Sequence, residues 1–176
     1  MGKEGAQVNG GRTLLRVTGV SKKFGGLTAV DDMSFDVSEH EVMGIIGPNG
    51  SGKTTMMNLI SGELRVSAGE ITMRGVELSA TPAHKIARHG VARTFQLVRV
   101  LPTLSVLDNV IAGGAFGHRR RWGSEARRAA ETLLERLGLA EHRNSTVNAL
   151  TYIDQKRLEL ARALASEPEV LLLDEW

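Results

Sequence analysis

The sequence predicts an α/β protein with a mixed sheet, an antiparallel β subdomain and a helical subdomain. β-patterned runs and short helical segments alternate up to about residue 96, and helical periodicity dominates from residue 103. A glycine-rich loop, residues 47–55, joins an apolar run to a helical segment. The length of 176 residues fits about one domain, and the content of 41% hydrophobic and 24% charged residues excludes a disordered chain.

Strands and short helices alternate in the first half of the chain. Residues 1–12 are Gly-rich and polar, so we expect a disordered tail there. Apolar and alternating runs predict strands at 14–20, 29–37, 42–46, 69–78 and 91–96, the fourth at a sheet edge, and helices at 54–60 and 82–89. A turn at Phe24-Gly25-Gly26 is expected to join the first two strands.

Helical periodicity is strongest in the second half of the chain. An apolar stripe predicts a helix that Gly138 ends, and it consists of Ala126, Ala129, Ala130, Leu133, Leu134 and Leu137. The same spacing predicts a last helix over 158–165. Residues 170–173 form a fully apolar run, typical of a buried strand in a parallel sheet, and Asp174 and Glu175 follow it.

Composition excludes several classes of function. The chain has no cysteine, so disulfides, thiolate metal sites and cysteine nucleophiles are excluded. No apolar run reaches the ~18 residues that span a bilayer, and the first residues lack the apolar stretch of a signal peptide. We therefore expect a cytoplasmic location. Few aromatic side chains argue against a dedicated binder of single-stranded nucleic acid.

A basic cluster lies at residues 116–128. Five arginines against Glu125 give it a local charge of +4, whereas the whole chain carries +2. We interpret the cluster as a solvated loop that runs into a helix; contact with anionic headgroups or nucleic acid is the alternative. A nucleic-acid partner is not expected.

The glycine-rich loop fits the phosphate-binding pattern G-x-x-x-x-G-K-[ST]. Glycines let successive backbone N–H groups turn inward at a helix N-terminus, where the helix dipole also favours an anion. Lys53 is expected to reach the β- and γ-phosphates, Thr54 to bind Mg²⁺ and Thr55 to contact the α-phosphate. The alternative is a glycine-rich turn with a surface lysine. The expected cofactor-binding residues of the loop are Gly47, Pro48, Asn49, Gly50, Ser51, Gly52, Lys53, Thr54 and Thr55.

Two carboxylates follow the apolar run at 170–173. In a parallel sheet they emerge at the carboxyl edge of the strands, where ligands bind. Asp174 is expected to hold Mg²⁺ directly or through water, and Glu175 to polarise an attacking water as general base. With the phosphate loop, these residues predict a nucleotide hydrolase.

Several motifs, taken in order, resemble the nucleotide-binding subunit of an ABC transporter. They are Phe24-Gly25-Gly26 with the following Leu27–Val30, the phosphate loop, Arg93-Thr94-Phe95-Gln96, and the segment LTYIDQKRLELARALASEPEVLLLDE over 150–175. The runs GVARTFQ from Gly90 and LPTLSVLDNV from Leu101 are most similar to the ATP-binding proteins of branched-chain amino acid importers. The resemblance covers about residues 13 to 175.

The resemblance implies a P-loop NTPase fold of the ABC-type ATPase, with ATP and Mg²⁺ as cofactors. It implies that Phe24 stacks on adenine and that Gln96 senses both Mg²⁺ and the attacking water, which makes Gln96 a catalytic and a metal-site residue. The domain would span 13–176. Within it, 13–96 would form the nucleotide-binding core and β subdomain, 97–165 the helical subdomain, and 166–176 the Walker B strand.

Partners are also implied by the resemblance. They are membrane-spanning permease subunits, a second ATP-binding subunit in a homo- or heterodimer and, indirectly, a periplasmic solute-binding protein. The protein would then lie on the cytoplasmic face of the cell membrane as a peripheral subunit. Its ATP binding and hydrolysis would drive an amino-acid importer.

The sequence departs from the family in its signature segment, which normally reads like LSGGQ. Here Thr151, Tyr152, Ile153 and Asp154 would face the ATP of the opposite subunit. Thr151 keeps the hydroxyl and can cap a helix, with Asp154 as its partner. Ile153 replaces a glycine, and a strained glycine conformation would cost it about 1–3 kcal/mol. The alternative is that Ile153 turns into the helical subdomain.

A second departure concerns the C-terminal end. The family's switch histidine, and a strand that family folds insert between the two motif-bearing strands, have no counterpart here, so we expect an incomplete domain with a gap in its sheet. Two other functions follow from these departures and from the shared motifs. One is a truncated remnant that at most binds nucleotide. The other is a soluble ABC ATPase outside transport, which the short segment between Gln96 and Leu150 disfavours, since it has no sustained heptads.

Overall fold

The computed structural model describes residues 12–174. The expected tail at 1–12 lies outside these residues except for Arg12, and Glu175 also lies outside them. The elements in chain order are β1 (Thr13–Phe24), β2 (Leu27–Ser38), α1 (Lys53–Ile60), β3 (Ala68–Met73), β4 (Val76–Glu77), α2 (Ala83–Arg88), β5 (Val91–Arg93), α3 (Val106–Phe116), α4 (Gly123–Arg136), α5 (Tyr152–Ala165) and β6 (Val170–Leu172). Short 3₁₀ turns, η1 (Ala140–His142) and η2 (Val147–Ala149), join α4 to α5.

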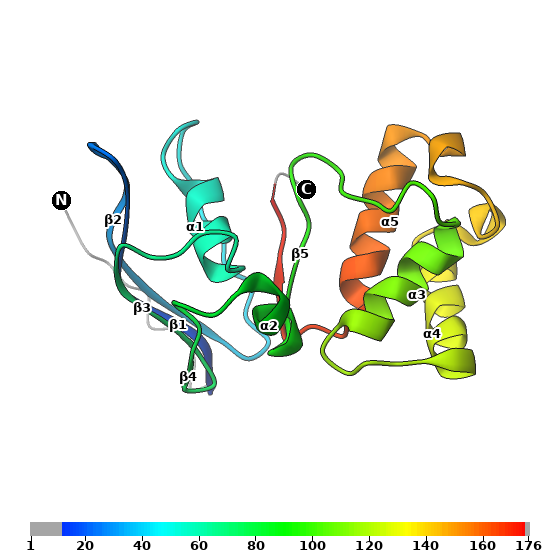
Figure 1. Ribbon diagram of the computed structural model, residues 1–176, viewed down its shortest axis with the longest axis horizontal. Helices are drawn as coiled ribbons and strands as arrows, with labels where there is room; N and C mark the ends of the chain where they lie inside the picture. Colours follow the sequence, from blue (N-terminus) through cyan, green and yellow to red (C-terminus); the bar gives the residue numbers. More distant parts are fainter. Residues whose placement is uncertain (1–11, 175–176) are drawn as a thin grey trace.

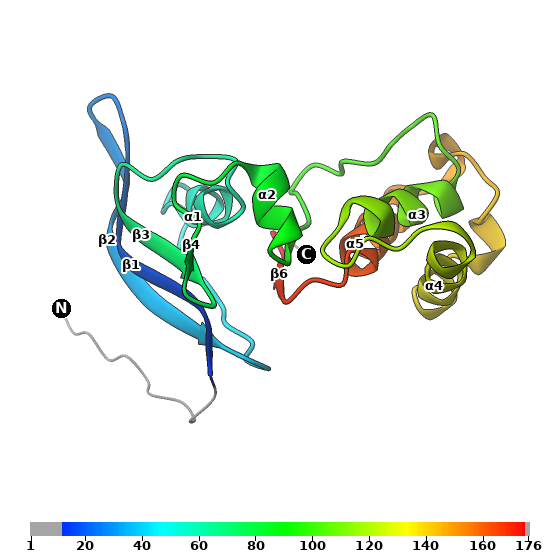
Figure 2. The ribbon, with the colours of Figure 1, turned by 60° about the horizontal axis from the view of Figure 1, so that its bottom comes forward.

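The elements form two parts that lie side by side (Figure 1). One part holds the antiparallel sheet, of order β2-β1-β3-β4, with α1 against it. The other part is the bundle of α3, α4 and α5. The parallel pair β5–β6, with α2 beside it, stands between the two parts in both ribbon views (Figure 2). The bundle is therefore an insertion between two neighbouring strands.

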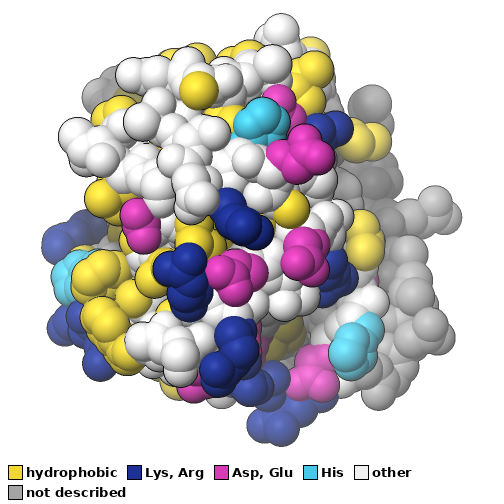
Figure 3. All heavy atoms as spheres, turned by 90° about the vertical axis from the view of Figure 1, so that its right-hand side faces the viewer, with side chains coloured by type: hydrophobic (Ala, Val, Ile, Leu, Met, Phe, Trp, Pro, Cys, Tyr) yellow, Lys and Arg dark blue, Asp and Glu magenta, His cyan; other side chains and the backbone are white. Residues whose placement is uncertain are grey.

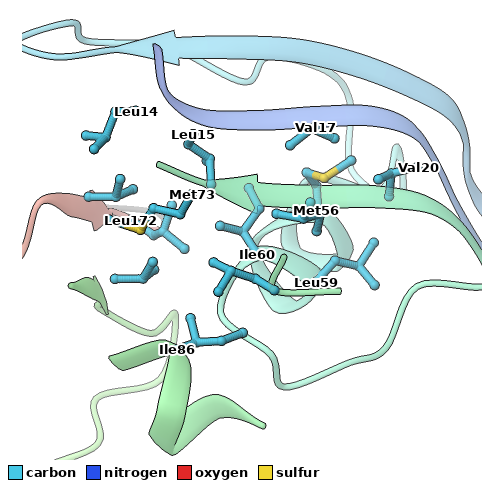
Figure 4. Packing of buried hydrophobic residues seen from close by; sticks show 14 of the residues in the cluster. Leu14, Leu15, Val17, Val20, Met56, Leu59, Ile60, Met73, Ile86 and Leu172 are labelled. Atoms are coloured by element: carbon cyan, nitrogen blue, oxygen red, sulfur yellow. The ribbon is translucent and has the colours of Figure 1, made fainter. Parts of the chain in front are cut away.

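Alternating apolar residues explain the antiparallel sheet. Leu15, Val17 and Ile71 point from β1 and β3 to one face, because successive side chains of a strand alternate between faces. Met56 and Ile60 of α1 pack against that face, one helical turn apart (Figure 4). This layer fixes α1, and with it the phosphate loop, against the sheet.

The helical bundle has its own apolar core. Buried residues from all three helices meet there, among them Val110, Leu134 and Leu158. Helices α3 and α5 approach closely at Gly113, where an added Cβ would lie 2.4 Å from the Arg162 carbonyl oxygen. Glycine at this position therefore sets the distance between these two helices. No helix within residues 12–174 has the length and apolar character needed to cross a bilayer.

Most of the expected elements are confirmed. The hairpin β1–β2 turns at Gly25 and Gly26, with Phe24 paired to Leu27. Helix α4 ends as expected, with Gly138 just beyond it at a φ of +71°. The expected helices at 54–60, 82–89 and 158–165 correspond to α1, α2 and α5.

The expected edge strand over 69–78 is wrong in two respects. A two-residue turn divides it into β3 and β4, because Arg74 and Gly75 adopt φ values of +49° and +80°. Strand β3 also pairs with β1 on its other side, so the edge belongs to β4. The short strand at the edge leaves few unpaired backbone groups exposed.

The expected strand at 42–46 is absent. A strand needs a hydrogen-bonded neighbour, and no described segment pairs with these residues. Val42 and Ile46 are instead 99% and 94% exposed. A cavity of about 480 Å³ is lined both by residues 40–43 and by residues 169–173 of the β6 region. The sheet thus has an opening at this place, and β6 pairs with β5 alone among the described strands.

The basic cluster at 116–128 is balanced by nearby carboxylates. Arg119 lies 3.3 Å from Glu167, and Arg121 contacts both Glu125 and Glu167. The space-filling view of the helical end shows basic and acidic side chains interspersed (Figure 3). These pairs favour the interpretation of the cluster as solvated surface.

Candidate functional site

The phosphate loop closes over the N-terminus of α1. Gly50 and Gly52 adopt the left-handed region, with φ of +82° and +90°. A Cβ at Gly52 would lie 2.4 Å from the carbonyl oxygen of Ala29 in β2. Glycine is therefore required at the N-cap of α1, both for its conformation and for the close approach of β2.

Lys53 folds back over this loop from the first position of α1. Its Nζ donates to the carbonyl oxygens of Gly47, at 2.7 Å, and Pro48, at 2.9 Å. The loop is also closed by a backbone hydrogen bond from Ser51 to Pro48. The ammonium group thus lies where it can exchange backbone oxygens for phosphate oxygens with little movement of the backbone.

A cavity of about 300 Å³ opens above the loop, at the lower end of the usual range for small-molecule sites. The residues that line it are Ala29, Asn49, Gly50, Gly52, Lys53, Thr54, Thr55 and Gln96. The structure therefore brings Gln96, from beyond β5, to the phosphate loop. A helix N-terminus with two left-handed glycines, one ammonium and two threonine hydroxyls suits a polyphosphate.

Phe24 does not line this cavity. It lies at the end of β1, next to the hairpin turn, and its side chain is 44% exposed. The ammonium of Lys22 lies 5.1 Å from the centre of its ring. Phe24 is thus an exposed aromatic ring at the hairpin tip.

Asp174 follows β6 and is buried. Its Oδ2 accepts a hydrogen bond of 2.8 Å from Nη2 of Arg93, and the two side chains are only 7% and 5% exposed. The parallel register, which pairs Arg93 with Leu172, brings them together. Arg93 was not expected as a site residue. An arginine within a short apolar strand could have indicated it, because arginine is rarely buried without a charged partner. The expected general base, Glu175, lies outside the described residues.

Metal ligands at this site would come from few side chains. Residues 12–174 contain no group of three or more His, Asp or Glu placed to hold a metal ion. Mg²⁺ keeps several waters and takes one or two protein ligands together with phosphate oxygens. The hydroxyl of Thr54 and the amide of Gln96 line the cavity, whereas the buried carboxylate of Asp174 is not part of its lining. These oxygen donors fit an ion that binds one or two protein groups directly and reaches others through water.

The signature segment begins α5. Thr151 is the N-cap, since its hydroxyl accepts from the Asp154 backbone N–H at 3.2 Å and donates to the Asp154 carboxylate at 2.6 Å. The expected capping is confirmed. The expected strain at Ile153 is wrong, because Ile153 lies in the first turn of α5 and has no positive φ. Its side chain is 65% exposed, so it does not turn into the bundle core.

The family model described as ABC transporter matches residues 30–176. The chain belongs to the ABC transporter family. A high-affinity branched-chain amino acid transport ATP-binding protein, LivG of Salmonella typhimurium, is 43% identical over 92% of this chain and 69% of its own length. The corresponding BraF of Pseudomonas aeruginosa is 38% identical over 93% of this chain and 69% of its own. An Fe(3+) ion import ATP-binding protein, FbpC of Streptomyces coelicolor, is 39% identical over 93% of this chain and 45% of its own length.

Solved ABC cassettes share the fold. The dimeric post-hydrolysis state of an ATP-binding cassette bound to ADP and Pi is 28% identical, with a TM-score of 0.82 over 92% of this chain and 73% of that one. The fold is therefore that of an ABC ATPase, a family of ATP hydrolases.

One further contact of this ABC ATPase joins Arg99, three residues after Gln96, to α5. The backbone N–H of Arg99 donates to buried Glu159 at 3.0 Å, and Arg162 donates to the Arg99 carbonyl. Burial lowers the pKa of the Arg162 guanidinium, against the opposing effect of the Glu159 charge. The only sequence pattern that indicates this contact is the charged pair Glu159 and Arg162 within the apolar spacing of α5.

Proposed function

We propose that this chain is the ATP-binding, energy-coupling subunit of an importer for branched-chain amino acids. The observation that carries the proposal is the loop of residues 47–55, with its left-handed glycines, its inward lysine and the cavity above it. The names of the LivG and BraF relatives support the solute class. The similarity to an Fe(3+) import protein supports import of some solute more broadly.

ATP would lie with its phosphates in the cavity above the loop. Backbone N–H groups and Lys53 would bind the phosphate oxygens, and Thr54 and Gln96, which line the cavity, would bind Mg²⁺. Asp174, which follows β6 outside this lining, would hold the ion directly or through water. When bound, Mg²⁺ neutralises phosphate charge. Phe24 would stack on adenine from the hairpin tip, and Glu175 would polarise the attacking water.

The proposed role in an importer requires partner proteins. A second ATP-binding subunit would present its own Thr151–Asp154 segment to this ATP, and permease subunits would meet residues of the helical bundle. A solute-binding protein would deliver the amino acid to the permease. The chain would act at the cytoplasmic face of the membrane as a peripheral subunit.

The first prediction tests nucleotide binding at the loop. Lys53→Ala removes a charge-assisted contact, so its affinity for Mg-ATP should fall by about 2 kcal/mol or more. Isothermal titration of both proteins with Mg-ATP measures the difference. Lys85→Ala, an exposed lysine of α2, is the matched control and should bind as the unaltered chain does. Equal affinity of all three proteins would reject the nucleotide site.

A second function, nucleotide binding without hydrolysis, is favoured by one observation. Ile153 covers the first turn of α5 with an exposed branched side chain, where the family has glycine. Dimer closure around ATP would then be weak. Phosphate release measured against protein concentration separates the two functions, since shared active sites give turnover that rises more than linearly.

A further inference from the structure

Arg93 is the most enclosed cation of the candidate site. Its Nη2 bonds Asp174, while its Nη1 donates to Asn58 at 2.5 Å and to Ser61 at 3.2 Å. The side chain is only 5% exposed. A buried guanidinium costs much free energy in desolvation, so each of its contacts has to be made in a defined geometry.

These contacts connect three parts of the site. Asn58 and Ser61 belong to the end of α1, the helix that begins at the phosphate loop. Asp174 follows β6, and Arg93 itself lies on β5, three residues before Gln96. The guanidinium carbon also lies 4.9 Å from the ring centre of Phe95, directly before Gln96.

The chemistry of arginine suits this position. Its planar fork holds two partners at fixed angles, whereas an ammonium is a single mobile charge. Arg93 therefore sets the direction of the Asp174 carboxylate relative to α1. If Asp174 moved independently of α1, the distance between this carboxylate and the Thr54 hydroxyl would vary.

We propose that Arg93 is a positioning residue that holds Asp174 in register with the phosphate loop, so that carboxylate and loop bind one metal–nucleotide complex together. The proposal rests on the proposed function, since it requires Mg-ATP at that loop. Arg93 acts through Asp174 and does not touch the phosphates. Removing it should therefore weaken the metal-dependent part of ATP binding more than the metal-independent part.

The test compares ATP affinity with Mg²⁺ and with EDTA in the full chain. For Arg93→Met, the gain in affinity that Mg²⁺ provides should fall by about 10- to 100-fold, the usual effect of losing a group that orients a metal ligand. Affinity in EDTA should change by less than about threefold. Equal weakening in both buffers, or none in either, would overturn the proposal.

A second test of the role of Arg93 uses a spectroscopic measurement that does not depend on ATP turnover. With Mn²⁺ as probe, the electron paramagnetic resonance spectrum of the Mn-ATP complex should differ between the unaltered chain and Arg93→Met, since the ligand geometry differs. Identical spectra at saturation would also overturn the proposal.

Three further variants separate positioning from charge and from folding. Arg93→Lys keeps the charge but not the fork, so it should restore part of the Mg²⁺ gain; full restoration would show that charge alone suffices. Asn58→Ala leaves the pair with Asp174 and removes the shorter of the two contacts between Arg93 and the end of α1. It should therefore lose part of the Mg²⁺ gain even if Arg93→Met does not fold, and an unchanged gain would contradict the role of α1. Arg16→Met, which breaks an exposed pair with Asp36, is the matched control and should leave the gain unchanged.

The same data distinguish failure of the inference from failure of the proposed function. An unaltered chain that shows no ATP binding in either buffer would reject the nucleotide site itself. An unaltered chain with a Mg²⁺ gain that Arg93→Met retains would reject only the role of Arg93.

Discussion

At the scale of single residues, the structure shows that Ile153, which stands where the family has glycine, does not strain the backbone. The residue is helical and not strained, so its backbone needs no glycine. What remains is the branched side chain, 65% exposed beside the first-turn N–H groups of α5. These groups have no partner within the helix ladder and are natural donors to an anion. Ile153 therefore affects access to these groups more than folding.

Ile153→Gly should strengthen ATP-dependent self-association. Removing the side chain opens the first turn of α5 to a phosphate of a second subunit, and we expect about a tenfold tighter dimer, or about 1.4 kcal/mol. Sedimentation velocity with and without Mg-ATP measures it. Thr132→Gly, at an exposed position of α4 outside this segment, is the control for loss of helix propensity. An effect of the same size in both variants, or no effect of Ile153→Gly, would contradict the role given to Ile153.

At the scale of elements, the start of α5 is held by a small polar network. Thr151 caps the helix, and Arg157 lies 3.0 Å from the Asp154 carboxylate. The hydrogen bond from the Thr151 hydroxyl is the largest cause that lowers the pKa of Asp154 below its ordinary value of 3.8. Desolvation opposes it, and the charge and hydrogen bond of Arg157 add smaller lowering effects. The ionised form is thus the one the folded helix favours.

The pH dependence of α5 follows from this direction. A lowered folded-state pKa gives stability that is complete above pH 3.8 and is lost as the pH falls through the lowered value. The stability difference between the unaltered chain and Asp154→Asn should therefore shrink on acidification across that window. Thermal unfolding followed at several pH values measures it. Thr132→Val, on α4, should leave the pH profile unchanged, and a difference that is constant with pH would contradict the assignment.

Local pattern predicted the elements whose stability is local. The apolar stripe of α4 and the glycine turn of β1–β2 are confirmed because spacing and turn geometry are properties of neighbouring residues. The start of α3 was missed, although Ser105 caps it by accepting from the Asp108 N–H at 3.0 Å, as a capping pattern would have indicated. The strand at 42–46 failed because an apolar run makes a strand only when a distant segment pairs with it.

Of the candidate site, the contiguous part was predictable from the sequence, and the contacts between distant positions were not. The glycines and lysine of the phosphate loop are contiguous, so the sequence indicated their chemistry directly. The pair of Arg93 and Asp174 joins positions 81 residues apart, and only the register of β5 and β6 brings it about. The contacts of Arg99 with α5 likewise depend on how this helix packs against residues 60 or more positions away, and no local pattern in the sequence identifies so distant a partner.

At the scale of the whole molecule, the opening beside β6 is the main irregularity. The segment before the phosphate loop exposes Val42 and Ile46 almost completely, and Leu173 beyond β6 is 42% exposed. Contiguous apolar surface next to unpaired backbone groups is a common site of self-association.

Replacing Val42 and Ile46 by Thr should reduce non-specific association. Threonine keeps the branched shape but adds a hydroxyl, so the unfolding free energy should change by less than about 0.5 kcal/mol. Static light scattering against protein concentration measures association. The matched control replaces Leu27 and Val76, exposed at two sheet turns, by Thr. If the control lowers scattering as much, the opening beside β6 has no special part in association.

The insertion of the helical bundle between β5 and β6 also sets an order of events when the chain folds. The bundle has its own core, whereas the strand pair must close a loop that contains the whole bundle. Closing a long loop costs entropy before any strand contact compensates it, so local helices form early and β5–β6 pairing comes late. The carboxylate of Asp174 meets its guanidinium only in that late step. During synthesis, the phosphate loop is therefore formed well before the chain can hold a metal–nucleotide complex in its final geometry.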